Sequence, residues 1–280
     1  MTQPRVFLVM PFIDKVEPEA MAAANRATAG RFKVDGKLSR GSALCRGINA
    51  PWAQMCNEGC YDYFAIIHSD VDPEGHWLDV LIGEMEQHGF DAIHAVSPIK
   101  DHYGLTSTAY GSISDPWKPV RRITTTEEIE NLPDTFDIAR IEKSLGRYGF
   151  GDDDLCMLCN TATLVVKVDR RIMANLPGPF AKKQRTGEEL IFWPKCFPGF
   201  TVLDRMVEDE TGFMHAESVS EDWWFGRWAA QNGMKVGGTK RVKVTHYGRH
   251  GFSSDHAWGM HKRDEAFFMR AAIDHDEDRL

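Results

Sequence analysis

The chain has 280 residues, a formal net charge of −8 and a hydrophobic fraction of 42% that includes 8 Trp and 16 Phe. This composition supports a large folded core and excludes an intrinsically disordered chain. The acidic balance disfavours nonspecific binding of duplex DNA as the main activity, although a local basic patch stays open. The N-terminus lacks the usual form of a signal peptide, and no stretch approaches the about 18 apolar residues of a membrane span. We therefore expect a soluble, cytoplasmic protein.

Six cysteines are expected to be reduced in that compartment. Four of them, Cys56, Cys60, Cys156 and Cys159, have spacings that could build a structural zinc site. However, the second pair stands among Leu and Met residues typical of a packed core, where a free cysteine behaves as a small hydrophobe. We therefore favour buried thiols over a zinc site.

The first 96 residues alternate between predicted strands and helices. Strands are expected over 5–10, 31–38, 63–67 and 91–96, and helices over 17–29, 42–59 and 73–88. Pro11 is expected to stop the first strand, Asp35-Gly36 to form a turn, and Pro51 to kink or divide the second helix. Gly59 and Gly89 suit helix C-caps. Such alternation indicates a largely parallel sheet with helices on both faces.

The pattern loosens after residue 96. We expect a long loop over 97–119, a short helix over 124–131, a strand over 163–168, a helical turn over 169–176 and an irregular segment over 177–198. Strands over 200–207, 211–216 and 242–245 and helices over 220–232 and 258–272 complete the chain, with Gly233 closing the first of these helices. The two long irregular segments are expected to be functional, because long loops on a rigid scaffold often carry function.

The predicted strand over 63–67 organises this arrangement. It is apolar throughout, as in a fully buried strand, and is followed by His68, Asp70 and Asp72. Ligands of open α/β sheets bind beyond the carboxyl ends of the strands. Two carboxylates one residue apart at that position can share Mg²⁺ or Mn²⁺ with substrate phosphates. A solvated, turn-forming pair of aspartates is the competing interpretation.

Two later segments could contribute to the same site. Ser220, Glu221 and Asp222 open a predicted helix, where a serine cap and two carboxylates also suit the helix dipole without any chemistry. His246 ends the last predicted strand, and imidazole is a common metal ligand. Together with Asp70 and Asp72, it would form an octahedral site with positions left open for a diphosphate.

In their order along the chain, these motifs resemble a known family. The Asp-x-Asp after the strand comes first, then the segment 160–166, the helix start 220–225, the turn 233–236 and the late His246. The series is similar to the GT-A-fold, nucleotide-sugar-dependent glycosyltransferases, in outline most to glycosyltransferase family two, over roughly residues 5–250. The resemblance implies an α/β, Rossmann-like, mostly parallel sheet with flanking helices. Residues 1–96 would form the nucleotide-sugar-binding half, 97–257 the acceptor-binding half of the same domain, and 258–280 a C-terminal helix and tail.

The resemblance also implies an activity and roles for residues. The protein would be a hexosyltransferase that uses Mn²⁺ or Mg²⁺ to move a sugar from a UDP- or GDP-sugar to a hydroxyl acceptor, a glycan or a modified nucleic acid. Asp70, Asp72 and His246 would hold the metal ion. Asp222, or with less support Glu221, would be the general base. The residues expected to contact the nucleotide sugar are Pro11, Phe12, Asp14, Arg40, Arg46 and Asp70.

Several alternatives stay open. His68 stands where the family commonly has an Asp, so the metal motif is either His68/Asp70 or Asp70/Asp72. The stereochemical outcome is also open, and in a retaining enzyme Asp222 need not be a base. A nucleotidyltransferase would require a Gly-rich phosphate loop after the first strand, and residues 10–15 contain no Gly. A non-catalytic carbohydrate- or metal-binding module is the third interpretation, and it needs no base.

Overall fold

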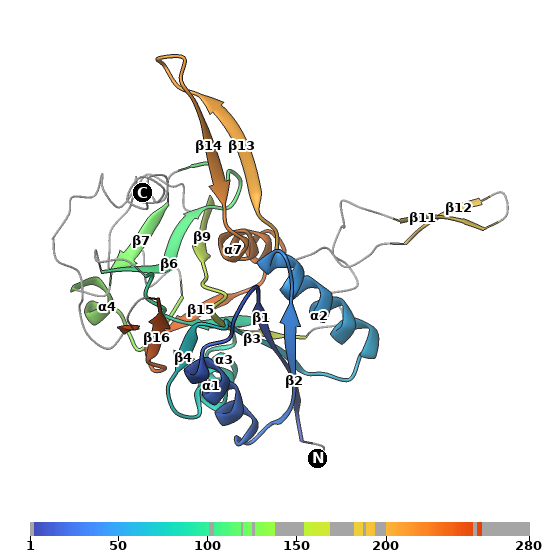
Figure 1. Ribbon diagram of the computed structural model, residues 1–280, viewed down its shortest axis with the longest axis vertical. Coiled ribbons are helices and arrows are strands. Elements are labelled where there is room, and N and C mark those ends of the chain that lie inside the picture. The colour runs from blue at the N-terminus through green and yellow to red at the C-terminus, as the bar shows by residue number, and fades with distance from the viewer. Residues whose placement is uncertain are drawn as a thin grey trace.

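A seven-stranded mixed sheet forms the centre of the part of the chain that the structure describes (Figure 1). The structure is a computed structural model, and it describes residues 3–100, 104–118, 120–124, 127–137, 154–168, 182–186, 189–193, 200–248 and 251–253. The strand order is β2-β1-β3-β10-β5-β15-β8. The strands are β1 (Arg5–Phe12), β2 (Lys33–Arg40), β3 (Tyr63–Ile67), β5 (Ala92–Ala95), β8 (Thr135–Phe136), β10 (Thr163–Lys167) and β15 (Val236–Thr239).

The direction of the strands agrees only in part with the expected parallel sheet. β1 pairs in parallel with β2 and β3, and β5 pairs in parallel with β15. β10 runs antiparallel between β3 and β5, and β8 is antiparallel to β15. The α/β class is therefore confirmed, whereas the mostly parallel character is not, because three of these six pairings are antiparallel. An apolar run such as that of β10 indicates burial on both faces but carries no signal for direction.

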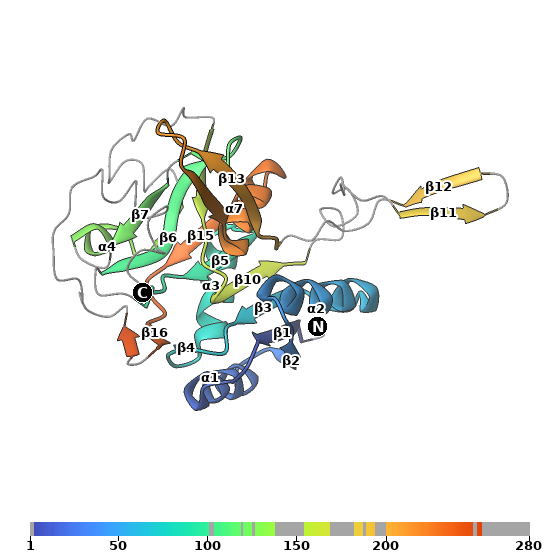
Figure 2. The same ribbon diagram turned by 45° about the horizontal axis from the view of Figure 1, so that its top comes forward.

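Helices cover both faces of the sheet, as predicted. Successive strand residues point to opposite faces. Val6, Leu8 and Ile67 pack with helices α1 (Pro18–Thr28) and α3 (Trp77–His88). Phe7, Val9 and Ile66 pack with α2 (Leu44–Glu58) and α7 (Glu221–Gln231) on the other face. The result is a three-layer arrangement, in which α1 and α2 lie on opposite sides of the β1–β2 end (Figure 2).

Smaller sheets extend this body. One contains β6 (Leu105–Ser112), β7 (Arg121–Thr124) and β9 (Leu155–Leu158), with α4 (Glu127–Asn131) after β7. A second contains β4 (Val71–Pro73), β16 (Val244–Tyr247) and β17 (Gly251–Ser253). Two hairpins, β11 (Lys182–Thr186) with β12 (Glu189–Trp193) and β13 (Leu203–Glu208) with β14 (Met214–Val219), complete the described elements. The β13–β14 hairpin stands out from the body (Figure 1).

The prediction of a long loop over 97–119 is wrong, because strand β6 occupies the centre of this segment. All eight residues of β6 are buried. Two of its hydroxyl groups donate to nearby carbonyls, whereas the buried Thr108 Oγ1 has no hydrogen-bond partner among the described residues. Thr106 Oγ1 donates to the Ile123 carbonyl at 2.6 Å, and Ser107 Oγ to the Ser97 carbonyl at 3.4 Å. A Ser- and Thr-rich strand can therefore be buried without unpaired polar groups at those positions. The prediction of an irregular segment over 177–198 is wrong for the part that forms the β11–β12 hairpin.

The predicted stop of the first strand at Pro11 is wrong, and so is the predicted division of the second helix at Pro51. β1 continues past Pro11 to Phe12, because β3 pairs with β1 only as far as Val9 and Pro11 breaks no bond on that side. α2 continues past Pro51 as a single helix, which tertiary packing of Ile48 and Trp52 holds in place.

Two element boundaries also differ from the sequence prediction. β2 runs straight through Asp35-Gly36 without a turn, and the Asp35 carboxylate accepts a hydrogen bond from the Arg5 guanidinium at 2.6 Å. The third helix begins at Trp77 instead of residue 73, because Pro73 pairs with Val244 in the β4–β16 ladder.

Other predictions are confirmed. The strand over 63–67, the first helix, the hairpin near 200–216 and α7 are present, and Gly59 and Gly89 have φ values of 63° and 67° as helix C-caps. The helices predicted over 169–176 and 258–272 and the proposed 258–280 tail lie outside the described residues. None of the helices within the described ranges combines the length and the apolar character that a membrane crossing requires.

Gly226 sets the distance between α7 and β9. A Cβ atom at this position would lie 2.5 Å from the Met157 carbonyl oxygen and 3.1 Å from the Leu158 Cα. Both of these are backbone atoms, so they cannot move aside as a side chain could. The close approach places the first turn of α7 over the residues that follow β9.

Gly226→Ala should therefore lower the free energy of unfolding by about 1–3 kcal/mol through overpacking. Gly83→Ala in α3 is the matched control, since its Cβ would meet only the end of the long Arg31 side chain, at 3.3 Å, and no backbone atom. That control should be neutral or stabilising by about 0.5–1 kcal/mol, as expected for alanine in a helix. Urea unfolding followed by circular dichroism measures both, and equal effects of the two substitutions would contradict the packing argument.

Candidate active site

Asp70 lies in the turn after β3, directly beyond the carboxyl end of a fully buried strand. Its Oδ2 atom lies 2.6 Å from Nζ of Lys100 and 3.4 Å from Nε2 of His246. Burial opposes ionisation of this carboxyl group, but hydrogen bonds and charge from His246 and Lys100 outweigh burial and hold the pKa of Asp70 well below its usual range. Asp70 is therefore an ionised carboxylate at neutral pH.

His246 presents one ring nitrogen to Asp70. Its Nδ1 lies 2.8 Å from the Pro98 carbonyl oxygen, which can only accept, so Nδ1 carries a proton. Nε2 is then the atom that faces the carboxylate, either protonated in an ion pair or with its lone pair directed at a shared cation. The orientation of the ring is thus fixed by the backbone of the segment that follows β5.

His68 belongs to the same cluster. Burial lowers the pKa of His68 to about 4, while the neighbouring Asp70 carboxylate acts in the opposite direction. Its imidazole is therefore neutral at pH 7, and its Nε2 lies 3.2 Å from Oγ1 of Thr161. The Ala162 carbonyl accepts the His68 backbone N–H at 2.9 Å, so the residues before β10 border the Asp70 turn.

Asp72 is directed elsewhere. Directly opposite residues of an antiparallel ladder share a face, and in the β4–β16 ladder His246 lies opposite Val71 whereas Asp72 lies opposite Thr245. The Asp72 carboxylate forms an ion pair with Arg26 of α1. The structure therefore brings His68, Asp70 and His246 together and does not bring Asp72 to them.

The donor set fits a cation that arrives with a ligand. Among the residues that the structure describes, no group of three or more His, Cys, Asp or Glu side chains could hold a metal ion by itself. Asp70 and His246 supply one carboxylate oxygen and one imidazole nitrogen 3.4 Å apart. Mg²⁺ and similar ions commonly take one or two protein ligands and fill the remaining positions with substrate phosphates and water. Cys156 and Cys159 are buried free thiols, as favoured from the sequence.

Residues predicted to contact the nucleotide gather at the same edge of the sheet. Pro11 and Phe12 end β1, and Arg40 ends β2 beside them. Arg46 lies in the first turns of α2, where the adjacent Gly47 is close enough to Pro11 that a Cβ would lie 3.1 Å from its ring. Arg40 and Arg46 are exposed, and neither forms an ion pair with another described residue. Their guanidinium groups are therefore available to an anion.

Asp14 lies in the loop after β1 and is exposed. At the far end of that loop, the Glu17 N–H donates to the Ser69 carbonyl at 2.7 Å, so the loop runs alongside the Asp70 turn. Lys15 in the same loop pairs with Glu17 at 2.5 Å and is close enough to Asp70 for the carboxylate to contribute to the raised pKa of the lysine. The loop thus adds a cation to this edge.

Glu221 and Asp222 open α7 and have different surroundings. The Asp222 carboxylate accepts hydrogen bonds from the Ser220 hydroxyl and, at 2.8 Å, from the Trp223 N–H. Ser220 therefore stands at the N-cap position without capping the helix backbone through its side chain. Burial raises the pKa of Asp222, and burial together with the charge of Asp222 raises the pKa of Glu221 to about 7. Glu221 is thus the carboxyl group with the proton affinity of a base near neutral pH.

Two chains of contacts join the start of α7 to the Asp70 turn. The Cys159 thiol donates to the Asp222 carbonyl at 3.7 Å, and Thr161, two residues later, contacts His68. In the second chain, Trp223 Nε1 donates to the Ser107 carbonyl at 3.1 Å and the Ser107 N–H donates to the Ser97 carbonyl at 3.1 Å. Ser97 precedes Pro98, whose carbonyl orients His246. These contacts connect the start of α7 to the segments that carry His68 and Pro98. Trp223 is buried with the Arg122 guanidinium 4.4 Å from its ring, so it packs in the core.

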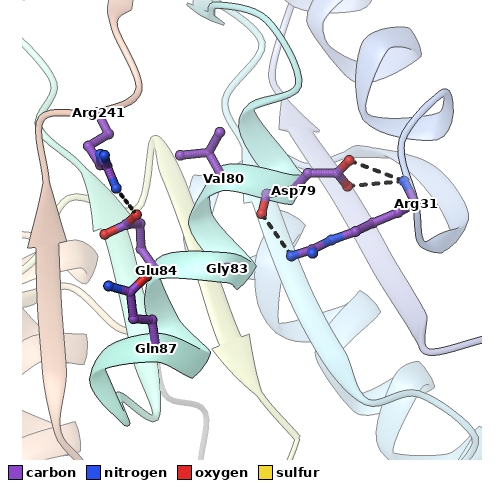
Figure 3. A pocket seen from close by; sticks show the side chains of 7 residues that line it. All are labelled: Arg31, Asp79, Val80, Gly83, Glu84, Gln87 and Arg241. Carbon is purple, nitrogen blue, oxygen red and sulfur yellow. Dashed lines mark hydrogen bonds and ion pairs between the residues drawn. The ribbon is translucent and has the colours of Figure 1, made fainter.

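Two hollows elsewhere on the described part of the chain contain none of the predicted site residues. One, of about 480 Å³, is lined by Arg31, Asp79, Val80, Gly83, Glu84, Gln87 and Arg241. Figure 3 shows its charged groups paired with one another, Arg31 with Asp79 and Arg241 with Glu84. The other, of about 360 Å³, lies between α7, β9 and β15 and is lined largely by apolar residues such as Phe90, Met157 and Met234. Neither arrangement offers the converging polar groups found around Asp70.

Sequence reasoning missed Lys100 and Thr161. Lys100 follows β5 at the same edge of the sheet as Asp70, so the rule that led to Asp70 could have identified it. Thr161 gave no such signal, because its position depends on the direction of β10.

Comparison with known proteins does not supply an identity. No protein-family model matches the chain, and no curated protein sequence matches it. Among solved structures, the chain is similar to one titled "Crystal Structure of A197 from STIV", with 12% identity and a TM-score of 0.47 over 87% of this chain and 85% of that chain. This degree of likeness defines neither a family nor an activity.

The raised pKa of Glu221 predicts a pH-dependent stability. A carboxyl group whose pKa rises from 4.5 to about 7 on folding stabilises the fold below pH 4.5, and this contribution disappears as the pH rises through 7. Glu221→Gln removes the cost of ionising a buried group. We expect it to raise the free energy of unfolding relative to wild type by about 1–2 kcal/mol more at pH 8 than at pH 5.

Urea unfolding at the two pH values measures this difference. Glu217→Gln is the control, because Glu217 lies on the neighbouring β14 and pairs with Arg205 at 2.5 Å. A Glu221→Gln effect that is the same at pH 5 and pH 8 would show that Glu221 is ordinarily ionised.

Proposed function

We propose that the protein is a metal-dependent glycosyltransferase that moves a sugar from a UDP- or GDP-sugar to a hydroxyl acceptor, on a Rossmann-like sheet of the GT-A type. The observation that carries the proposal is the cluster at the carboxyl end of β3. There, directly beyond a fully buried strand, an ionised Asp70 faces Nε2 of His246 at 3.4 Å and Nζ of Lys100 at 2.6 Å. The glycan or modified nucleic acid expected from the resemblance remains a proposed acceptor class.

The electrostatics of this edge support a diphosphate ligand. Asp70 and His246 would hold Mn²⁺ or Mg²⁺, which lowers the charge on the diphosphate and improves the nucleoside diphosphate as a leaving group. Arg40 and Arg46 are exposed at the ends of β2 and in α2, where their planar guanidinium groups suit phosphate oxygens. Pro11, Phe12 and Asp14 lie beside them and would contact the nucleoside.

The transfer requires one bond to form and one to break. The bond between the anomeric carbon and the phosphate oxygen breaks, and the acceptor oxygen forms a bond to that carbon. In an inverting reaction, a general base takes the hydroxyl proton of the acceptor. Glu221 has the stronger case for this role, because its pKa is about 7 whereas Asp222 is engaged by Ser220 and the Trp223 N–H.

The test is release of nucleoside diphosphate. We expect the protein, incubated with Mn²⁺ and a panel of UDP- and GDP-sugars, to release UDP or GDP, and to stop when EDTA is added. Release of pyrophosphate from a nucleoside triphosphate and a sugar phosphate would instead identify a nucleotidyltransferase. Binding without any release would identify a carbohydrate-binding module.

Asp70→Asn should abolish this turnover, because an amide is a far weaker ligand for Mn²⁺ than a carboxylate. Its Tm should stay within about 3 °C of wild type, since a partly exposed ion pair contributes only about 0–1 kcal/mol. Asp62→Asn, at the opposite end of β3, is the matched control and should remain active.

Asp72→Asn separates the two registers of the metal motif. Because Asp72 pairs with Arg26 and lies on the other face of the β4–β16 ladder from His246, we expect turnover to fall by no more than about tenfold. A loss as complete as that of Asp70→Asn would assign the cation to Asp70/Asp72 instead.

A further inference from the structure

Lys100 occupies a position on Asp70 that a cation would need. Its ammonium lies 2.6 Å from Oδ2, the same oxygen that faces His246 Nε2 at 3.4 Å. The Asp70 side chain is 30% exposed and that of Lys100 is 37% exposed, so the pair is open to incoming ligands. Any divalent ion bound to that oxygen would lie next to the positive charge of the Lys100 ammonium group.

The backbone around Lys100 is held in place while its side chain is not. The Pro98 carbonyl contacts His246 Nδ1 at 2.8 Å, and the Ile99 N–H donates to the Leu105 carbonyl at 3.1 Å. The ammonium group of Lys100 is carried on a flexible four-carbon chain. Among the described residues, its one ion-pair contact is with Asp70. It can therefore leave the carboxylate without any change in the fold.

We propose that Lys100 is a built-in counter-cation that neutralises Asp70 when no ligand is bound and transfers its charge to the diphosphate when a divalent ion arrives. The inference rests on the proposed function for the nature of the ligand, but its first half concerns the metal ion alone. Repulsion between Lys100 and the ion makes metal binding weak without nucleotide. The diphosphate then accepts the displaced ammonium, so metal and nucleotide strengthen each other's binding.

This role differs from that of an ordinary surface ion pair. A surface pair would contribute a little stability and would leave ligand affinities unchanged. A counter-cation that must be displaced would lower the affinity for metal alone and raise the affinity for nucleotide. The two ligands therefore respond to its removal in opposite directions, which no simple loss of structure would produce.

Isothermal titration calorimetry of the full chain tests the proposal with Mn²⁺ alone and with UDP and GDP in the presence of Mn²⁺. We expect Lys100→Met to bind Mn²⁺ alone about tenfold more tightly than wild type, and to bind the preferred nucleotide about tenfold more weakly. Lys100→Arg, which keeps the charge, should resemble wild type. Lys167→Met is the matched control, because it removes the same charge from the Lys167–Glu86 pair on β10 and should change neither affinity.

Each outcome decides the matter. If wild type binds Mn²⁺ with nucleotide but Lys100→Met binds Mn²⁺ alone no better, the counter-cation role is wrong and the proposed function stands. If wild type binds nucleotide equally well with EDTA and Lys100→Met loses that binding, Lys100 is a permanent replacement for the metal ion and its release is refuted. If neither protein binds Mn²⁺ under any condition, both the inference and the proposed function fail. Thermal melts of all variants exclude misfolding as the cause of a lost signal.

Discussion

The insertion of β10 between β3 and β5 is the constraint on which the site depends. Because β10 runs antiparallel to both neighbours, its first residue, Thr163, lies beside Ile67 at the carboxyl end of β3. The preceding residues, 159–162, are therefore delivered to the same edge as Asp70. A parallel β10 would carry them to the opposite end of the sheet. The contacts that link His68 to the start of α7 all follow from this direction.

Charge is distributed unevenly around that edge. The carboxylate of Asp70 is held ionised by its neighbours, while Lys15, Arg40, Arg46 and Lys100 contribute positive charge from three separate segments of the chain. Two of these cations are already matched by carboxylates of the same edge, Lys15 by Glu17 and Lys100 by Asp70. Arg40 and Arg46 are exposed and form no ion pair with another described residue, so they are the cations of this edge that no described carboxylate neutralises.

Much of the sheet and its two helical layers could be predicted from the sequence, because apolar spacing reports burial directly. The buried strand before Asp70 and the helix that begins at Glu221 are examples. Direction and register could not be predicted in this way. The antiparallel course of β10 and the ladder that turns Asp72 away from His246 depend on contacts between residues far apart in the chain. Composition was a poor guide for β6, in which the hydroxyl groups of Thr106 and Ser107 bond to neighbouring carbonyls within the fold.

The β13–β14 hairpin has a consequence for how the chain responds to proteases. Its outward face is exposed, with Met206 at 65% and Met214 at 50%, and an anchor to the body is the Arg205 guanidinium 4.2 Å from the ring centre of Trp117. A hairpin of two strands buries too little surface to be stable alone. Its local opening therefore requires only a small fraction of the free energy of global unfolding. Cleavage at its turn would leave two fragments that do not separate, because β15, which follows the cut, is paired between β5 and β8 in the central sheet. The cleaved protein would therefore remain a non-covalent complex of two fragments, held together by the same sheet that the intact chain forms.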